Sequence, residues 1–276
     1  IHELSIDVKK GEIVAVVGSS GSGKSLLAHA IMGILPENSK TKGSIKYYND
    51  ELNEKYLRKV RGKDIAFIPQ SVDFLDPLMK VGKQVVGING NKERQKEVFK
   101  KYNLDDKVAE MYPFQLSGGM ARRVLIATAV MNEAKLIIAD EPTPGLNLEL
   151  AMETLNNFRE IADSGCGVLL ITHDVDLALN VADRIAVFYS GTIVEIAQVE
   201  DFIKGKDALR HPYSKAFIDA LPQNKFKELP GYQPYAGNLP KGCLFRDRCS
   251  LKTDECCMEI KMRKVRDGEV RCINAT

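Results

Sequence analysis

Short runs of apolar and β-branched residues alternate along the chain with longer stretches of helical periodicity. Five of these runs stand out, and they read EIVAVVG, DIAFI, KLIIAD, GVLLIT and RIAVFY. Apolar runs of this length, separated by helical segments, are typical of parallel strands joined by crossover helices. The pattern therefore predicts an α/β fold with a mostly parallel sheet, extending to about residue 200.

The pattern changes beyond that point. Five of the eleven prolines lie between His211 and Pro240, and five of the six cysteines lie in the last 34 residues. Because proline limits regular structure, we predict three parts: an α/β domain over residues 1–204 with a helical insertion at about 71–130, a Pro-rich linker over 205–240, and a Cys-rich extension over 241–276. The opening IHELSIDV already alternates like a strand, so we expect the domain to be incomplete at its N-terminus.

Composition narrows the possible partners. The chain has 276 residues, 44% hydrophobic and 28% charged, with a formal net charge of +2. That charge is too small for a protein that coats nucleic acid phosphates. No apolar run approaches the roughly 20 residues that span a bilayer. We therefore expect a chain that can bury a core, that does not bind nucleic acid and that does not itself cross a membrane.

The stretch GSSGSGKS at residues 18–25 predicts a phosphate-binding loop. It follows a strand-like run, precedes the helical LLAHAIMGI, and matches the pattern Gly-x-x-x-x-Gly-Lys-Ser. Glycines allow backbone N–H groups to converge on phosphate oxygens, a lysine reaches the terminal phosphates, and a serine hydroxyl binds Mg²⁺. The predicted nucleotide-binding residues are Gly18, Ser19, Ser20, Gly21, Ser22, Gly23, Lys24 and Ser25.

A pair of carboxylates ends the third apolar run. In KLIIADEP, Asp140 and Glu141 follow four apolar residues and precede a proline that stops the strand. The carboxyl ends of strands are where α/β sheets bind ligands. We expect Asp140 to bind Mg²⁺ with Ser25, and Glu141 to orient and deprotonate an attacking water. The alternative is that the two acids simply lie on the solvent surface. A phosphate loop in the same chain makes this alternative less favoured.

Two further polar residues follow predicted strands. Gln70 comes after IAFIP and His173 comes after GVLLIT. Each alone is an ordinary loop residue. Beside a phosphate loop and an acidic pair, both are expected to be catalytic: Gln70 to join Ser25 and Asp140 as a ligand of Mg²⁺ or to sense the water, and His173 to contact the γ-phosphate.

The stretch LSGGMARR predicts a second anion-binding helix N-terminus. Ser117, Gly118 and Gly119 stand at the start of a predicted helix, where backbone N–H groups favour an anion. One chain thus carries two anion-binding helix N-termini but a single phosphate loop. The simplest explanation is that the helix N-terminus at Ser117 binds the nucleotide of a partner subunit.

Taken in order, GSSGSGKS, Gln70, LSGGM, LIIADEP and ITHD resemble the ATP-binding cassette (ABC) family over about residues 1–200. The tail, with HPYSKAFIDALP and GCLFRDRC, is similar to ATPase subunits of bacterial dipeptide, oligopeptide and nickel importers. The resemblance implies a P-loop NTPase core with an antiparallel β subdomain and a helical insertion. It implies that ATP and Mg²⁺ are bound, and that the aromatic residue stacking on adenine precedes Ile1.

The same resemblance implies an assembly at the cytoplasmic face of a membrane. A second, different ABC ATPase subunit would pair head to tail with this chain, so that Ser117, Gly118 and Gly119 act in trans. Two transmembrane permease subunits would be driven directly, and an extracytoplasmic solute-binding protein indirectly. Asn147 stands where the family commonly has an aspartate that contacts the neighbouring subunit.

The implied function is ATP hydrolysis that powers peptide uptake through a bacterial importer. A nickel or metal-chelate importer of the same subfamily is one alternative. A soluble ABC-type ATPase acting on nucleic acid is another, disfavoured because the long heptad arms it needs are missing between the phosphate loop and LSGGM. A binding-only domain, which does not hydrolyse ATP, is the third.

The cysteines of the tail allow three interpretations. Cys243, Cys249, Cys256 and Cys272 are spread without a Cys-x-x-Cys zinc pair, and Cys257 is an extra adjacent thiol. Four thiolates suit zinc or an iron–sulfur cluster, and the resemblance to importer subunits implies a [4Fe–4S] cluster. The third interpretation is that the thiols are unligated or form disulfides, which cytosolic proteins rarely carry.

Overall fold

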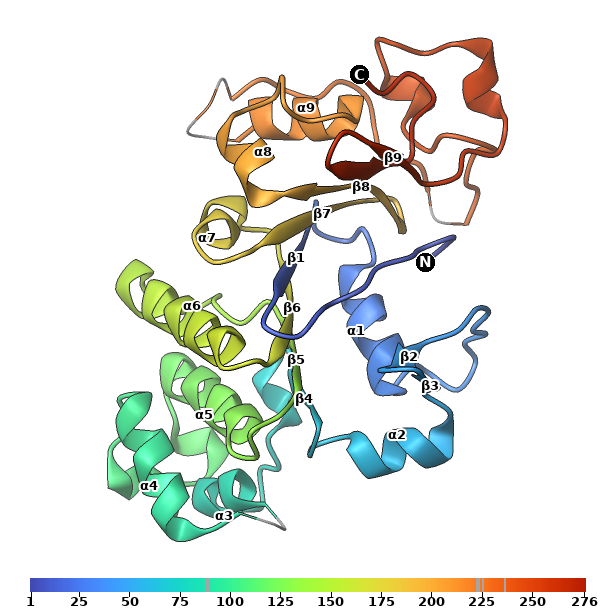
Figure 1. The fold of residues 1–276 in the computed structure, drawn as a ribbon. Helices are drawn as coiled ribbons and strands as arrows, with labels where there is room; N and C mark the ends of the chain where they lie inside the picture. The colour runs from blue at the N-terminus through green and yellow to red at the C-terminus, as the bar shows by residue number, and fades with distance from the viewer. Residues whose placement is uncertain (88–89, 222–223, 225, 236) are drawn as a thin grey trace. The chain divides into compact units, whose positions relative to one another are not determined.

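The computed structural model describes residues 1–276 except 88–89, 222–223, 225 and 236 (Figure 1). The chain divides into two compact units. The first unit contains Ile1–Asp7, Val14–Lys24 and Thr172–Thr276, and the second contains Val8–Ile13 and Ser25–Ile171. In the described part of the chain, no helix has both the length and the apolar character needed to cross a bilayer.

The second unit is built on a parallel sheet. Its strands are β4 (Ile65–Ile68), β5 (Leu136–Asp140) and β6 (Gly167–Thr172), in that order, with Ile65 opposite Leu136 and Leu136 opposite Gly167. Strands covered on both faces need apolar residues at successive positions, which is why these segments read as continuous apolar runs. A separate antiparallel pair is formed by β2 (Lys46–Tyr47) and β3 (Asp50–Glu51).

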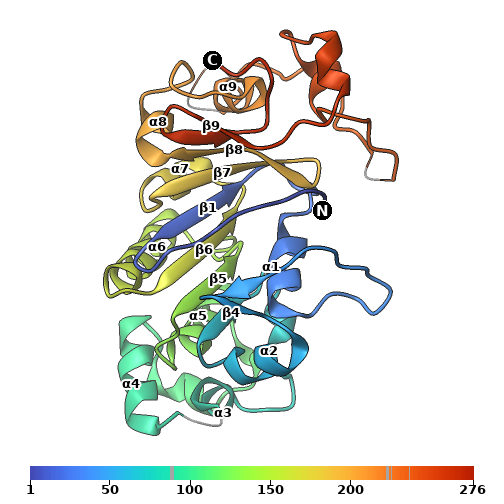
Figure 2. The ribbon, with the colours of Figure 1, turned by 45° about the vertical axis from the view of Figure 1, so that its right-hand side comes forward.

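Helices cover both faces of this parallel sheet. Figures 1 and 2 show α1 (Lys24–Met32) on one face, and α5 (Gly118–Val130) and α6 (Leu148–Asp163) on the other. The remaining helices of the unit are α2 (Glu54–Val60), α3 (Val81–Val86), α4 (Lys92–Lys101), and the short 3-10 helices η1 (Val72–Phe74), η2 (Asp106–Glu110) and η3 (Pro113–Gln115). Within the predicted helical insertion, α3 packs against α5, α4 and η2.

The first unit contains a mixed sheet in the order β1-β7-β8-β10-β9. Its strands are β1 (Ile13–Val17), β7 (Arg184–Tyr189), β8 (Thr192–Gln198), β9 (Arg263–Val265) and β10 (Gly268–Val270). β1 runs parallel to β7, and the other neighbours are antiparallel. The C-terminal extension thus contributes two strands, because β10 pairs directly with β8.

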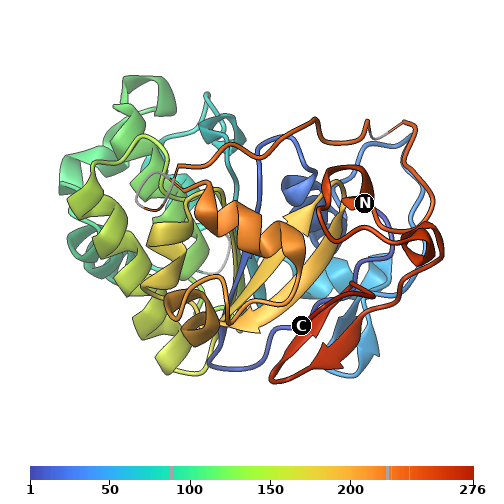
Figure 3. The same cartoon turned by 90° about the horizontal axis from the view of Figure 1, so that it is seen from above.

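Short helices complete the first unit. They are α7 (Val175–Leu179), α8 (Val199–Ile203), α9 (Pro212–Asp219), and the 3-10 helices η4 (Arg246–Arg248) and η5 (Asp254–Cys257). α9 packs on β8 (Figure 3), inside the segment that we predicted as a Pro-rich linker. Pro212 begins this helix, because a proline at the first helical position has no N–H group that needs a partner.

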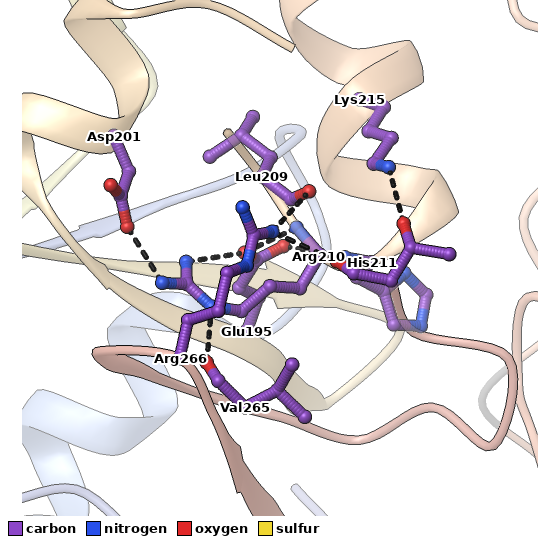
Figure 4. A network of polar contacts seen from close by, with 9 residues as sticks. Glu195, Asp201, Leu209, Arg210, His211, Lys215, Val265 and Arg266 are labelled. Carbon is purple, nitrogen blue, oxygen red and sulfur yellow. Dashed lines mark hydrogen bonds and ion pairs between the residues drawn. The ribbon is translucent and has the colours of Figure 1, made fainter. Parts of the chain in front are cut away.

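A buried polar network attaches the C-terminal extension to β8 (Figure 4). The Glu195 carboxylate, which is completely buried, accepts the backbone N–H groups of Arg210 and His211, both at 2.8 Å. The Arg210 guanidinium lies 3.4 Å from Glu195 Oε1, and its Nε donates to the Val265 carbonyl at 2.6 Å. Arg210 Nη2 also lies 2.8 Å from Asp201 Oδ2, as an ion pair without hydrogen-bond alignment. One buried arginine therefore joins β8, α8 and β9.

Candidate nucleotide-binding site

The predicted phosphate loop connects β1 to α1. A Cβ atom at Gly18 would lie 2.4 Å from the Phe188 carbonyl oxygen, so the close approach to β7 requires glycine. Gly21 and Gly23 have φ values of 74° and 102°, in the region that favours glycine. These three positions explain why the loop can turn back so tightly in front of α1.

Two side chains of the loop are buried. Lys24 Nζ donates to the carbonyl oxygens of Gly18 at 2.9 Å and Ser19 at 3.1 Å, so the ammonium group is held against the loop. The buried Ser22 hydroxyl has no hydrogen-bond partner among the described residues. Because a buried hydroxyl without a partner is costly, this donor fits an added phosphate oxygen.

Ser25 and Asp140 lie together in the second unit. Ser25 Oγ donates to Asp140 Oδ1 at 3.1 Å, and Asp140, the last residue of β5, is only 1% exposed. A hydroxyl and a carboxylate are the oxygen ligands that Mg²⁺ prefers. The donor set therefore fits the predicted metal, with Ser25 and Asp140 as the protein ligands.

Glu141 has an unusual backbone conformation. Its φ is 48°, in the left-handed region, and it is 6% exposed. Its N–H donates to the Ile171 carbonyl at 2.8 Å, which holds the residue beside β6. Left-handed backbone costs an ordinary residue about 1–2 kcal/mol, and such strain concentrates at functional sites. The turn at Glu141 ends the extended conformation of β5.

Arg122 links α5 to Gln70 and the acidic pair. This buried side chain donates to the carbonyl oxygens of Pro69 at 2.9 Å and Gln70 at 2.7 Å. Burial lowers the pKa of Arg122, whereas the charges of Asp140 and Glu141 raise it. The Gln70 side chain itself is exposed. The sequence alone does not reveal this connection, because Arg122 and Gln70 lie 52 positions apart.

The N-terminus of α5 is open. Ser117 is the N-cap residue, and its hydroxyl accepts the Met120 N–H at 3.3 Å. Ser117 and Gly118 are exposed, and a Cβ atom built on Gly118 meets nothing within 4 Å. Asn147 has the equivalent local role at α6, where its Oδ1 accepts the Leu150 N–H at 2.9 Å. The predicted second helix N-terminus is therefore formed and accessible.

His173 directly follows β6 and belongs to the first unit. The next residue, Asp174, donates its N–H to Thr172 Oγ1 at 3.0 Å, and its carboxylate caps α7 through the Leu177 N–H at 3.0 Å. These bonds fix the backbone on both sides of His173, whose side chain is exposed.

The cysteines of the tail are free thiols. Burial is the main cause that raises the pKa of Cys243, Cys249 and Cys272, the last to about 11, and the charges of neighbouring thiols in the same cluster add to it. Across the part of the chain that the structure describes, no three His, Cys, Asp or Glu side chains are arranged to hold a metal ion. The expected iron–sulfur cluster, and zinc equally, therefore gain no support from the structure.

Two protein families match the sequence. The ABC transporter family matches residues 1–144, and the C-terminal region of oligopeptide/dipeptide transporters matches residues 194–256. The dipeptide transport ATP-binding protein DppD of Haemophilus influenzae is 32% identical, over 99% of this chain and 88% of its own length. DppD of Escherichia coli is 34% identical, over 93% of this chain and 84% of its own length. The oligopeptide transport ATP-binding protein OppD of Mycobacterium tuberculosis is 34% identical over 93% of this chain, which spans only 45% of that relative.

Solved structures agree with these matches. The dimeric structure of a bacterial ABC transporter cassette has a TM-score of 0.64 and 28% identity, and the alignment covers 71% of this chain and 89% of that one. A nucleotide-free ATP-binding cassette from an ABC transporter has a TM-score of 0.61 and 25% identity, covering 73% and 86%. The chain therefore belongs to the ABC transporter family of ATPases.

Proposed function

We propose that this chain is the ATP-hydrolysing subunit of a bacterial ABC importer that powers peptide uptake through a membrane permease. The observation that carries the proposal is the order of two matched regions in one chain, an ABC cassette followed by an oligopeptide/dipeptide transporter C-terminal region. The relatives named above transport dipeptides and oligopeptides.

Each site residue has a proposed role. The backbone of residues 18–23, the Ser22 hydroxyl and Lys24 bind the phosphates of ATP. Ser25 and Asp140 would hold Mg²⁺, which offsets the negative charge of the phosphates when it is bound. Glu141 orients the attacking water and accepts its proton. His173 contacts the γ-phosphate, and Gln70 contacts the metal or the water. Arg122 fixes the backbone of Gln70 from α5.

A second ATPase subunit completes the site in this proposal. The open N-terminus of α5 offers Ser117, Gly118 and Gly119 to a nucleotide held by another chain, since this chain has one phosphate loop of its own. Dimeric solved cassettes show that such proteins pair. We propose that the partner is a different ATPase subunit, so that the pair is a heterodimer.

The permease partners are proposed to dock on the helical insertion. Large apolar side chains are exposed between Gln70 and α5, in η1, in the turn that follows it and in η3: Val72, Phe74, Leu78, Met79 and Phe114. An exposed group of this kind marks a surface that another protein covers. Two transmembrane subunits bound there would hold the chain at the cytoplasmic face of the membrane, with a solute-binding protein acting on their far side.

The alternatives receive less support. A nickel or metal-chelate importer would use the same cassette, but the relatives described above are peptide transport proteins. An ATPase acting on nucleic acid fits poorly with a net charge of +2. The [4Fe–4S] cluster on Cys243, Cys249, Cys256 and Cys272 is a separate proposal for the tail. It rests on the resemblance to importer subunits.

Reconstitution tests the function directly. The chain would be assembled in proteoliposomes with its partner ATPase and permease subunits and a solute-binding protein, and uptake of labelled peptides and of nickel would be measured. The proposal predicts ATP-dependent peptide uptake that Lys24→Ala abolishes, because the phosphates lose their main cation. Uptake of nickel without peptide, or ATP hydrolysis coupled to no uptake, would contradict it.

A further inference from the structure

A segment far along the chain contacts the phosphate loop. Ser19 Oγ donates to Gln233 Oε1 at 3.2 Å, across 214 positions of sequence. Gln233 lies between α9 and the cysteines of the tail. The Ser19 carbonyl also accepts a hydrogen bond from Lys24 at 3.1 Å. A single residue of the loop therefore contacts both the phosphate-binding lysine and the C-terminal region.

Tyr213 joins α9 to the tail. Burial raises the pKa of Tyr213 to about 12, and the nearby Ser19 side chain opposes that rise. The Tyr213 ring packs on Tyr189, with centroids 4.4 Å apart, and on Phe245 at 5.3 Å.

The cysteine tail anchors the segment that contains Gln233. Arg248 Nε donates to the Pro230 carbonyl at 2.8 Å, and Nη2 donates to the Leu229 carbonyl at 2.9 Å. Gly231 then turns the chain with a φ of 75° toward Gln233. Phe245 and Arg248 stand within the tail between Cys243 and Cys249. The hydrogen-bonded route from the tail to Ser19 thus runs through the segment that contains Gln233.

We propose that Gln233 is a positioning residue for nucleotide binding, which holds Ser19 so that the phosphate loop keeps the conformation that receives ATP. The inference rests on the proposed binding of ATP by this loop. It adds that the segment around Gln233, which Arg248 of the C-terminal extension holds in place, is part of the nucleotide site. Because coupling between two sites is reciprocal, bound ATP should also stabilise the contact between Ser19 and Gln233.

A double-mutant cycle on the full chain tests the coupling. Gln233→Ala, Ser19→Ala and the double variant would be compared by calorimetric titration with ATP. One net hydrogen bond corresponds to about a three- to tenfold loss of affinity. We expect each single variant to lose about that much and the double variant to lose no more. Ser19→Thr keeps the hydroxyl and should retain affinity. The control is Tyr232→Ala, since Tyr232 is 95% exposed beside Gln233.

Two further readouts separate positioning from general stability. Thermal unfolding temperatures of Gln233→Ala and wild type should agree while their ATP affinities differ. ATP should slow amide hydrogen exchange in residues 229–248 of the wild type but not of Gln233→Ala. Wild-type affinity in Gln233→Ala, or additive losses in the double variant, would overturn the inference. Lys24→Ala distinguishes a failure of this inference from a failure of the proposed function. If Lys24→Ala binds ATP normally, the proposed function fails as well.

Discussion

Glu141 shows at the scale of a single residue how local strain serves a site. Its left-handed backbone is unfavourable for glutamate, yet its N–H is held by the Ile171 carbonyl and the residue is buried. A glutamine fits the same backbone and the same volume but cannot accept a proton. The residue therefore offers a substitution that changes chemistry without changing shape.

We expect Glu141→Gln to bind ATP as the wild type does and to reduce turnover by at least ~10²-fold, because general-base catalysis contributes about that factor. Calorimetry would measure binding, and phosphate release in the assembled complex would measure turnover. Glu133→Gln is the matched control, since Glu133 also has a left-handed φ, of 49°, but is exposed. Wild-type turnover in Glu141→Gln would remove Glu141 from its assigned role.

Some residues of the site can be predicted from the sequence, and others cannot. The positions of Gly18, Gly21 and Gly23 predict a phosphate loop. In the structure, Gly18 allows a close approach to the Phe188 carbonyl, and Gly21 and Gly23 have the positive φ values that favour glycine. Ser19 and Gln233 give no such signal. Both are common polar residues, and only the folding of the chain brings together positions 214 apart.

At the scale of elements, burial decides which strands can be predicted. The five apolar runs form β1, β4, β5, β6 and β7, which confirms those strand predictions. β8 was not predicted, because Glu195 interrupts its apolar run and the polar Thr192 and Gln198 stand at its ends. Its burial becomes possible only through Arg210 and the N–H groups before α9. β9 and β10 have three residues each, too few for a periodic pattern.

The Glu195 network makes the stability of β8 testable. Glu195→Ala leaves the Arg210 guanidinium and two backbone N–H groups without their buried acceptor. Breaking a buried pair on one side costs about 3–5 kcal/mol. We expect a loss of about that size in the free energy of unfolding, measured with urea. Glu200→Ala, an exposed acid at the start of α8, should change it by less than ~0.5 kcal/mol. Equal effects would show that the network does not stabilise β8.

His211, at the start of α9, makes the stability of the protein depend on pH. It is the N-cap residue, and its Nδ1 accepts the Tyr213 N–H at 3.0 Å. Burial lowers the pKa of His211 to about 3, against an opposing hydrogen bond with the backbone of Arg271. The ordinary pKa is about 6.5, so between these values the unfolded chain binds a proton that the folded chain does not. Stability from this group therefore falls as the pH drops from about 6.5 toward 3 and is constant above 6.5.

His211→Asn isolates that effect, because asparagine can cap α9 and does not titrate. We expect the free energy of unfolding of the wild type to fall relative to that of His211→Asn when the pH is lowered from 8 to 5. Urea unfolding at both pH values measures the difference. Parallel changes in the two proteins would mean that His211 keeps an ordinary pKa in the folded state.

At the scale of the whole molecule, the tail has its own test. Anaerobically purified protein should be brown and contain about four iron and four sulfide per chain if the [4Fe–4S] proposal is right. Cys243→Ser, Cys249→Ser, Cys256→Ser and Cys272→Ser should each remove the colour. Cys257→Ser should not, since Cys257 is the exposed neighbour of Cys256. A colourless preparation with zinc or without metal would reject the cluster.

The central claim is that the two anion-binding helix N-termini of one chain serve two different nucleotides. Ser117 stands at an accessible helix end, whereas Lys24 is held within the phosphate loop. The most direct measurement is the ATP dissociation constant of the isolated Ser117→Arg chain beside those of the wild type and Lys24→Ala. We predict that Ser117→Arg binds ATP like the wild type although it abolishes hydrolysis at the partner's site, while Lys24→Ala loses its own binding. Loss of ATP binding in isolated Ser117→Arg would show that the second helix end acts on its own chain's nucleotide, and would contradict the account.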